Sequence, residues 1–254
     1  MWVTAGIILL AFNTLTRAEP SRTVFTTITS DSEEFDISYP DNIHSERELP
    51  ICKLNAACSV LHRRFWFKIK LERLCRCPNQ YQCPREWSQQ HHDNRTMMLN
   101  NRSQFKFCQI ISNLSTCGPR DLALTVSTNR TKVTVSYNRS AVATFVSVVA
   151  YCNCSPENYW KLHRQGSSKN NKTTTRNYRC TKLRKCNTGE FCGNIRADHY
   201  SAFYQCSCPI GHWCIFTNSS LQPATELLYN GPAYKGVCYL HTPPTRRPYY
   251  IPRY

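Results

Sequence analysis

The stretch LCRCPNQYQCP, Leu74–Pro84, places Cys75 and Cys77 one residue apart and adds a third cysteine at Cys83. Side chains two residues apart in a strand lie about 6 to 7 Å from each other, at the edge of disulfide geometry. We therefore expect Cys75 and Cys77 to bridge to two different neighbouring strands. Structural zinc sites usually pair ligands at C-x-x-C spacing, which this chain lacks, so the stretch predicts disulfides rather than a metal site.

The same motif recurs twice further along the chain. Gln205–Cys214, QCSCPIGHWC, repeats it closely, and Tyr151–Trp160, YCNCSPENYW, repeats it more weakly, with Trp160 in the place of the last cysteine. Upstream, CKLNAAC at Cys52–Cys58 matches CTKLRKC at Cys180–Cys186. These spacings predict one module used about three times, complete in the last copy and partly degenerate in the first two.

The even number of cysteines and an apolar start indicate an oxidising, secretory environment. Residues 1–18 read as a signal peptide, and no later apolar run is long enough for a transmembrane segment, so we expect a secreted, extracellular protein. All 16 cysteines are predicted to pair, with the connectivity left open. They are Cys52, Cys58, Cys75, Cys77, Cys83, Cys108, Cys117, Cys152, Cys154, Cys180, Cys186, Cys192, Cys206, Cys208, Cys214 and Cys238.

Eight Asn-x-Ser/Thr sequons agree with a secreted glycoprotein. Asn153 is the least suited to modification because it lies between two cysteines. The candidate N-glycosylation sites are therefore Asn94, Asn101, Asn113, Asn129, Asn138, Asn171 and Asn218.

Composition divides the chain into segments. The expected order is signal peptide 1–18, acidic flexible leader or propeptide 19–50, first cysteine-rich half 51–160 with two modules, basic linker 161–179, second cysteine-rich half 180–240 with one complete module, and Pro-rich basic tail 241–254.

The loops between cysteines carry β-strand patterns. Residues 122–151 predict a three-stranded meander and residues 194–205 a hairpin. Residues 65–70 favour a strand, with a helix as the alternative because Leu61, Phe65 and Leu71 would share one helix face. Together they predict a small disulfide-rich, mainly β fold of about three repeated cysteine-knit β-modules joined by loops, with little helix. Small modules bury little apolar surface, so we expect each bridge to raise the free energy of unfolding by about 2 to 4 kcal/mol.

Charge is the strongest functional indication outside the cysteines. After residue 50 the chain holds 29 of its 32 Lys and Arg residues but only half of its 16 acidic ones, a net charge of +21. Such a surface favours an anionic partner: an ion channel, an anionic lipid, a heparin-like polysaccharide or another anionic extracellular protein surface. No nucleic-acid-binding, catalytic, metal or cofactor motif is present, so we expect no nucleic acid, cofactor or enzymatic activity.

A basic and aromatic stretch, HRRFWFKIK at His62–Lys70, is the candidate contact surface. Cations beside aromatic rings suit docking on an acidic, partly apolar partner. The candidate contact residues are Arg63, Arg64, Trp66, Lys68 and Lys70. The alternative is that Phe65 and Phe67 belong to the core and that the basic side chains are merely solvated.

The cysteine order from Cys52 to Cys238, with the flanks CKLNAAC, LCRCPNQYQCPREW and CNCSPENYW, resembles the large cysteine-rich centipede venom proteins of scoloptoxin family 11. That resemblance implies a secreted venom toxin with a full set of disulfides that acts on a membrane ion channel, with a potassium channel favoured. It implies no site residue.

The repeated cysteine-knit modules are also similar in style to Argos-type growth-factor antagonists. That similarity implies the alternative function, a secreted binding module that sequesters an extracellular ligand such as a growth factor. The two functions differ in whether the chain alters ion currents or captures a soluble partner.

Overall fold

The computed structural model describes residues 35–88, 94–135, 139–155, 157–168, 170 and 172–240, which form β-strands with two short 3-10 helices. The predicted signal peptide, residues 19–34 of the predicted leader and the predicted tail lie outside them. No helix within the described part is long and apolar enough to cross a membrane. The strands and eight disulfides confirm the predicted disulfide-rich, mainly β fold.

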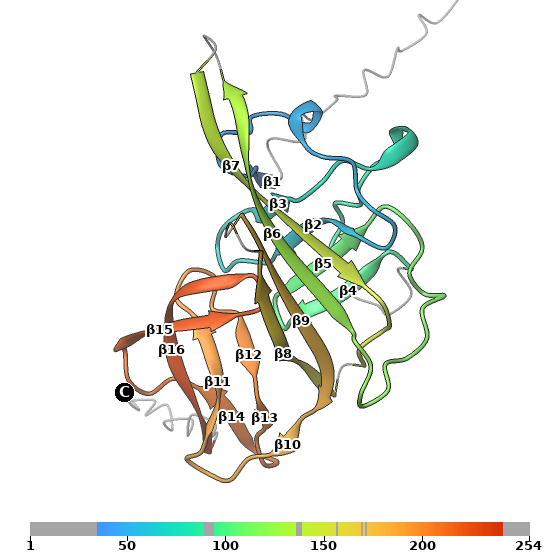
Figure 1. The fold of residues 1–254 in the computed structure, drawn as a ribbon. Coiled ribbons are helices and arrows are strands. Elements are labelled where there is room, and N and C mark those ends of the chain that lie inside the picture. Colours follow the sequence, from blue (N-terminus) through green and yellow to red (C-terminus); the bar gives the residue numbers. More distant parts are fainter. Residues whose placement is uncertain are drawn as a thin grey trace, which may run out of the picture. The chain divides into compact units, whose positions relative to one another are not determined.

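Module 1, residues 35–111, contains a five-stranded sheet in the order β1-β3-β2-β5-β4 (Figure 1). Its elements are β1 Phe35–Ser38, η1 Glu46–Glu48, β2 Ala57–His62, β3 Ile69–Arg73, η2 Pro78–Gln80, β4 Thr96–Asn100 and β5 Ser103–Phe107. Strand β2 is buried along its whole length, so its sequence ACSVLH shows no polar alternation. Val60 packs into a core that also includes Leu124 and Phe203 from the rest of the chain, whereas Leu61 packs against Leu71.

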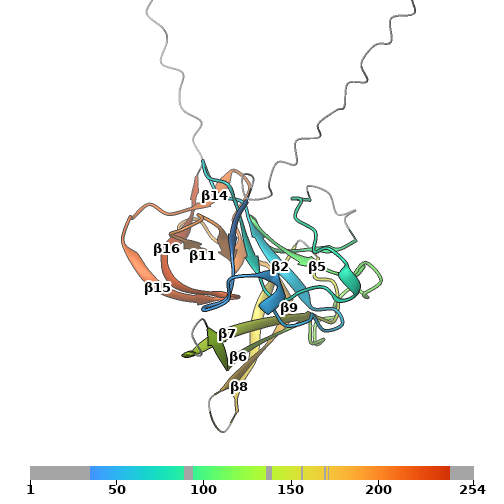
Figure 2. The same cartoon turned by 90° about the horizontal axis from the view of Figure 1, so that it is seen from above.

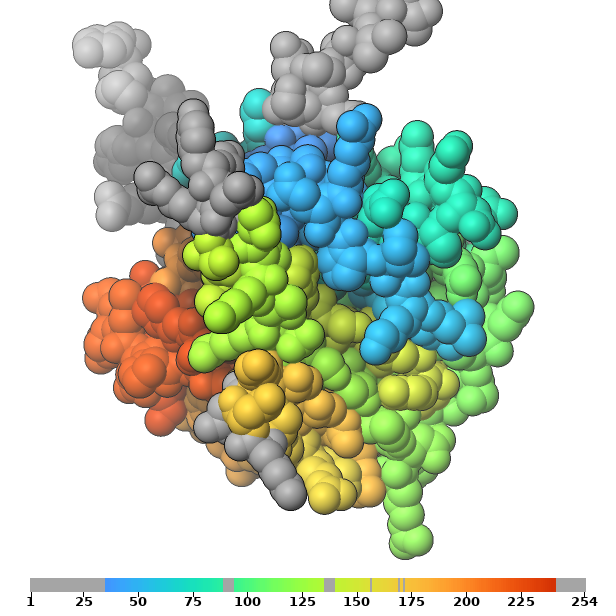
Figure 3. All heavy atoms as spheres, turned by 45° about the horizontal axis from the view of Figure 1, so that its top comes forward, coloured from blue at the N-terminus to red at the C-terminus, as the bar shows by residue number. Residues whose placement is uncertain are grey.

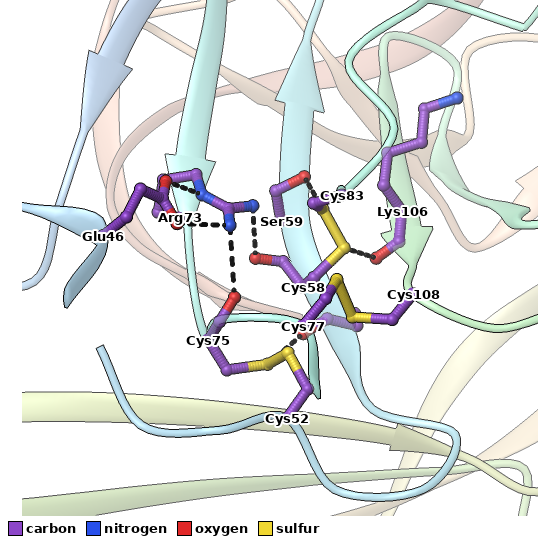
Figure 4. Close-up of polar contacts among 11 residues, drawn as sticks. Glu46, Cys52, Cys58, Ser59, Arg73, Cys75, Cys77, Cys83, Lys106 and Cys108 are labelled. Carbon is purple, nitrogen blue, oxygen red and sulfur yellow. Dashed lines mark hydrogen bonds and ion pairs between the residues drawn. A yellow bond between two sulfur atoms is a disulfide. The ribbon is translucent and has the colours of Figure 1, made fainter. Parts of the chain in front are cut away.

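Three disulfides cross-link module 1: Cys52–Cys75, Cys58–Cys83 and Cys77–Cys108 (Figure 4). Cys75 and Cys77 thus bridge to different partners, as predicted, although Cys52 and Cys108 lie outside the strands.

Module 3, residues 184–240, contains a sheet in the order β12-β11-β16-β14, with β15 also paired to β16 and a small parallel pair of β10 and β13 (Figure 1). Strands β11, β14, β15 and β16 are seen from above in Figure 2. Its strands are β10 Arg184–Lys185, β11 Phe191–Arg196, β12 Ala202–Tyr204, β13 Cys206–Ser207, β14 His212–Ile215, β15 Leu221–Glu226 and β16 Tyr229–Leu240. Strands β11 and β12 pair antiparallel, which confirms the predicted hairpin. Gly193 permits their close approach, because a Cβ there would lie 2.2 Å from the carbonyl oxygen of Phe203.

The disulfides of module 3, Cys186–Cys206, Cys192–Cys214 and Cys208–Cys238, repeat the pattern of module 1. With cysteines counted in order within a module, both modules pair the first with the third, the second with the fifth and the fourth with the sixth. The first copy is therefore complete, contrary to the expectation of degeneracy. The predicted start of the last copy at Cys180 is also wrong, since Cys180 bridges to Cys154.

Module 2, residues 112–182, contains a four-stranded antiparallel sheet in the order β7-β6-β9-β8 (Figure 1). Its strands are β6 Leu124–Val135, β7 Arg139–Ala150, β8 Asn158–Ser167 and β9 Thr173–Lys182. The meander expected over residues 122–151 is two strands rather than three. Residues 128–131, TNRT, where a third strand would require a turn, instead continue β6, because they include no glycine or proline and pair with β7.

Only two disulfides, Cys117–Cys152 and Cys154–Cys180, cross-link module 2. The spacing of the other modules would put the missing second and fifth cysteines at Ala123 and Trp160. Ala123 is fully buried in a cluster with Cys152 and Cys180, and Trp160 packs against that cluster. A small and a large side chain therefore occupy the positions of the absent bridge.

The basic linker predicted at residues 161–179 is wrong, since most of it lies in β8 and β9. Strand β8 forms the edge of its sheet and is largely exposed, while β9 begins with three threonines, which favour strands. Because a half-exposed strand pair needs few apolar residues, the composition of residues 161–179 resembles that of a linker.

The flexible leader predicted at residues 19–50 is wrong for residues 35–50. Strand β1 pairs in parallel with β3, and Ile43 and Leu49 pack against Ala143 of β7. Figure 3 shows these N-terminal residues (blue) beside the β6–β7 hairpin (yellow-green). Glu46 of this segment accepts from the buried Arg73, with Nη2 2.7 Å from Oε2 (Figure 4).

Candidate functional site

Residues 63–68 form the loop between β2 and β3 and carry four of the five candidate contact residues, while Lys70 lies in β3. The strand predicted over residues 65–70 is confined to Ile69 and Lys70. Phe65 is 42% exposed, Trp66 92% and Phe67 71%. The alternative in which Phe65 and Phe67 belong to the core is therefore wrong.

Trp66 adopts a left-handed backbone conformation with a φ of 56°, which ends the strand pattern. The same conformation occurs at Tyr200, in the turn between β11 and β12, with a φ of 53°. For bulky side chains this region is sterically costly, by about 1 to 3 kcal/mol. Such residues gather at binding sites, so the strain at two exposed aromatic side chains indicates function.

Five aromatic side chains form a continuous row that joins modules 1 and 3. We name it the aromatic row: Trp66, Phe65, Tyr200, Tyr234 and Phe216. Ring centroids are 5.4 Å apart for Phe65–Trp66, 6.3 Å for Phe65–Tyr200, 6.2 Å for Tyr200–Tyr234 and 4.1 Å for Phe216–Tyr234. Trp66, Phe65 and Tyr200 are exposed, and Tyr234 and Phe216 are half-buried.

Arginines adjoin the module 1 end of the row. The guanidinium carbon of Arg102 lies 3.2 Å from the centroid of the Phe65 ring, and Arg102 Nη1 donates to the carbonyl oxygen of Arg63 at 3.1 Å. Partial burial, together with the charge of Arg63, lowers the pKa of Arg102. An arginine on an aromatic ring combines apolar contact area with charge, the combination that dominates binding energy in protein interfaces.

The structure divides the five predicted contact residues into two groups. Trp66, Arg63 and Lys68 are exposed in the loop, with Arg63 5.6 Å from the centroid of the Trp87 ring. Arg64 and Lys70 form ion pairs within the chain. Arg64 Nη2 lies 2.9 Å from Asp36 Oδ2, and Lys70 Nζ lies 2.7 Å from Glu72 Oε1, so these two cations stabilise the loop base.

The turn between β11 and β12 also connects the two modules beneath the row. Asn101 Oδ1 accepts from the backbone N–H of Ala202 at 2.8 Å. The buried rings of His62, on β2, and His199, in the turn, lie with centroids 4.8 Å apart.

Charged groups surround this histidine pair. Burial, with the charges of His62 and Arg196, lowers the pKa of His199 to about 4. Burial would raise the pKa of Glu72, but the nearby His62 and Lys70 side chains hold it well below its usual range. His62 Nε2 lies 3.3 Å from Glu72 Oε2 without hydrogen-bond alignment. The interface is therefore suited to neutral His199.

Several groups of three cysteine sulfurs lie within 4.8 Å of one another, including those of Cys52, Cys77 and Cys108. Every cysteine in the chain belongs to a disulfide. A disulfide sulfur has no thiolate to bind a metal ion, so these groups are cross-links.

The predicted glycosylation sites differ in their surroundings. Exposed asparagines are Asn94, Asn101, Asn113, Asn129 and Asn218, while Asn138 and Asn171 lie outside the described residues. Asn101 is engaged in the contact with Ala202. Asn153 Nδ2 donates to the carbonyl oxygen of Leu114 at 2.9 Å, which agrees with its exclusion from the candidates.

Sequence reasoning missed the module 3 half of the row, Tyr200, Phe216 and Tyr234. The third loop is visibly aromatic, but only folding brings Phe216 and Tyr234 next to Tyr200 from two other segments. A left-handed backbone conformation can be predicted from the sequence where Gly, Asn or Asp occupies a turn, but not for a tyrosine such as Tyr200.

No protein-family model matches the chain, and no curated protein matches it. Membership of scoloptoxin family 11 therefore stays a prediction. Among solved structures, unliganded Argos matches with a TM-score of 0.48 and 23% sequence identity, over 82% of this chain and 100% of that chain. A likeness of this extent shows no shared function.

Proposed function

We propose that the chain is a secreted, non-catalytic binding protein that sequesters an acidic extracellular protein, such as a growth factor, on the aromatic row. The observation that carries this proposal is the row itself, five aromatic side chains in contact across two modules with Trp66 92% exposed. Exposed aromatic residues flanked by arginine are the composition of binding hot spots.

The strong positive charge supports an acidic partner. Residues 51–254 carry a net charge of +21, and Arg63, Lys68 and Arg102 lie in or beside the loop that holds Trp66. Complementary charge steers the encounter and rejects basic partners, while the aromatic side chains supply buried area. Eight disulfides support secretion, because such bridges persist in oxidising compartments.

The test starts with capture from extracellular fluid by the oxidised chain, followed by calorimetry with the purified partner. Trp66→Gly with Tyr200→Gly removes two rings from the row while placing glycine where the backbone φ is positive. Trp213→Ala, a 57% exposed tryptophan outside the row, is the matched control.

We expect saturable binding of an acidic protein that weakens as salt rises, is lost in the double glycine variant and persists in Trp213→Ala. Equal binding by wild type and the double glycine variant would contradict the proposal.

We propose channel inhibition as a second candidate, in the form of a venom toxin that acts on a potassium channel. The exposed trio of Arg63, Trp66 and Lys68 favours it, because a cationic loop with an aromatic tip suits an acidic channel vestibule. Whole-cell recording on potassium, sodium and calcium channels tests it, with the reduced and alkylated chain as control. Block by the oxidised chain and loss of block in Trp66→Gly would support this candidate; unchanged currents on all three would reject it.

A further inference from the structure

A cleft of about 980 Å³ is lined by none of the side chains of the aromatic row. Its walls come from β4 and β5 of module 1, β8 of module 2, and β11, β12 and β15 of module 3. This volume lies at the upper end of the range for small-ligand sites.

The cleft walls are polar but nearly uncharged. Among the described lining residues there are eight Asn and Gln side chains, and only Lys161 and Glu226 carry charge. In a chain with 32 Lys and Arg residues, this composition argues against an anionic ligand at this site. Amides both donate and accept hydrogen bonds, which matches the donor and acceptor character of hydroxyl groups.

Aromatic side chains line the cleft from two modules. The half-buried rings are Tyr159 and Trp160 from β8 and Tyr204 from β12, while Phe203 of β12 reaches the cleft from the buried core. Flat rings offer apolar faces to the C–H face of a sugar ring, while neighbouring amides bind its hydroxyl groups.

Two polar side chains that line the cleft can form further hydrogen bonds to a ligand. Asn100 Nδ2 is buried and has no hydrogen-bond partner within the described residues, although Asn100 Oδ1 accepts from the backbone N–H of Arg102 at 2.9 Å. A buried donor without a hydrogen bond destabilises the protein, so an acceptor atom on a ligand would bind there favourably. Glu226 Oε1 accepts from Asn194 Nδ2 at 2.6 Å, and a carboxylate can accept further bonds.

We infer that this cleft binds a neutral oligosaccharide. Such a ligand could reach it from two sources. Asn94 lines the cleft, is exposed and begins the sequon Asn94-Arg95-Thr96, so a glycan on Asn94 would start at the cleft wall. The other source is a glycan on a separate partner. This inference is independent of the aromatic row.

Calorimetry with a released high-mannose N-glycan distinguishes these sources. The titrated proteins are the secreted wild type and Asn94→Gln, with glycopeptide mass spectrometry at Asn94. If the chain's own glycan fills the cleft, wild type carries a glycan at Asn94 and binds no free oligosaccharide, while Asn94→Gln binds it. If the glycan belongs to a partner, both proteins bind. No binding by either protein would overturn the inference.

Asn100→Asp in the Asn94→Gln background replaces the unpaired donor Asn100 Nδ2 by an oxygen without changing the size of the side chain. We expect its affinity for the oligosaccharide to fall about tenfold in a variant that still unfolds cooperatively. Asn187→Asp adds the same charge at an exposed position outside the cleft and should leave affinity unchanged. Equal affinities for the two variants would overturn the assignment. Trp66→Gly should bind the oligosaccharide normally, which keeps this test separate from that of the aromatic row.

Discussion

Module 2 differs from modules 1 and 3 in what holds its centre together. Modules 1 and 3 close it with a bridge between the second and fifth cysteines, Cys58–Cys83 and Cys192–Cys214. Module 2 has Ala123 and Trp160 at those positions. The same knot is thus stabilised once by packing and twice by covalent cross-links.

The presence or absence of the central bridge accompanies a difference in strand length and in exposed turns. Module 2 extends four strands of 10 to 12 residues, and its long hairpin packs against residues 35–50. Apart from the 12-residue β16, the strands of modules 1 and 3 have six residues or fewer, and these two modules hold Trp66 and Tyr200 in strained turns. A triply bridged knot constrains the unfolded chain more strongly, so it can tolerate strain in a loop that lacks a core of its own.

Removal of a central bridge is the largest expected effect. Cys58→Ala with Cys83→Ala opens a loop of 25 residues and should lower the free energy of unfolding by about 3 kcal/mol. Urea unfolding of the oxidised proteins measures it. A loss below about 1 kcal/mol would show that packing, not the bridge, stabilises module 1.

Trp160→Ala should have the next largest effect, a loss of about 2 kcal/mol, because Trp160 is only partly buried against the cluster of Ala123. Ala123→Cys with Trp160→Cys should form a ninth disulfide and regain most of that loss. Mass spectrometry detects the bridge and urea unfolding measures the gain. Two free thiols in the oxidised protein would contradict the equivalence of these positions with the central bridge.

Acid should weaken the interface of modules 1 and 3 but not module 2. Because the pKa of His199 falls from its ordinary value of 6.5 to about 4, its stabilising contribution is complete above pH 6.5 and is lost as pH falls toward 4. The free energy of unfolding should change by up to about 1.4 kcal/mol per pH unit in this range.

His62, Lys70 and Glu72 of module 1 and Arg196 and Asp198 of module 3 complete this environment. The pKa values of Glu72 and Asp198 are lowered, so their contributions are lost only at still lower pH. Thermal unfolding across pH 4 to 6.5, with His199→Gln as control, measures the effect. An unchanged slope in His199→Gln would assign it to other groups.

Trp66→Gly should have the smallest effect on stability, within about 1 kcal/mol. Relief of left-handed strain offsets the greater freedom of glycine in the unfolded chain, and the side chain is 92% exposed. Thermal unfolding checks this. A larger loss would mean that Trp66 stabilises the fold.

The sequence predicts a repeated disulfide-rich module because C-x-C spacing and its repetition are local patterns, but the pairing of the cysteines and the bounds of each copy depend on tertiary contacts. Trp160 is visible as the odd member of that pattern, whereas Ala123 becomes recognisable only once the shared connectivity is known. Strands β8 and β9 were missed because a half-exposed strand pair is stabilised by backbone hydrogen bonds and resembles a polar linker.

The candidate site was predicted in part. Arg63, Trp66 and Lys68 follow from local composition, but ion pairs between distant residues remove Arg64 and Lys70 from the exposed set. Tyr234 and Phe216 join the row through tertiary contacts. The cleft has no local signature, because three modules contribute its walls.

The most direct test of the account is the affinity of Trp66→Gly for the captured acidic partner, measured by calorimetry beside Trp213→Ala and with thermal unfolding of each protein. The account predicts at least a tenfold loss of affinity in Trp66→Gly with intact folding, and no loss in Trp213→Ala. Wild-type affinity in a folded Trp66→Gly protein would contradict the assignment of the aromatic row as the binding surface.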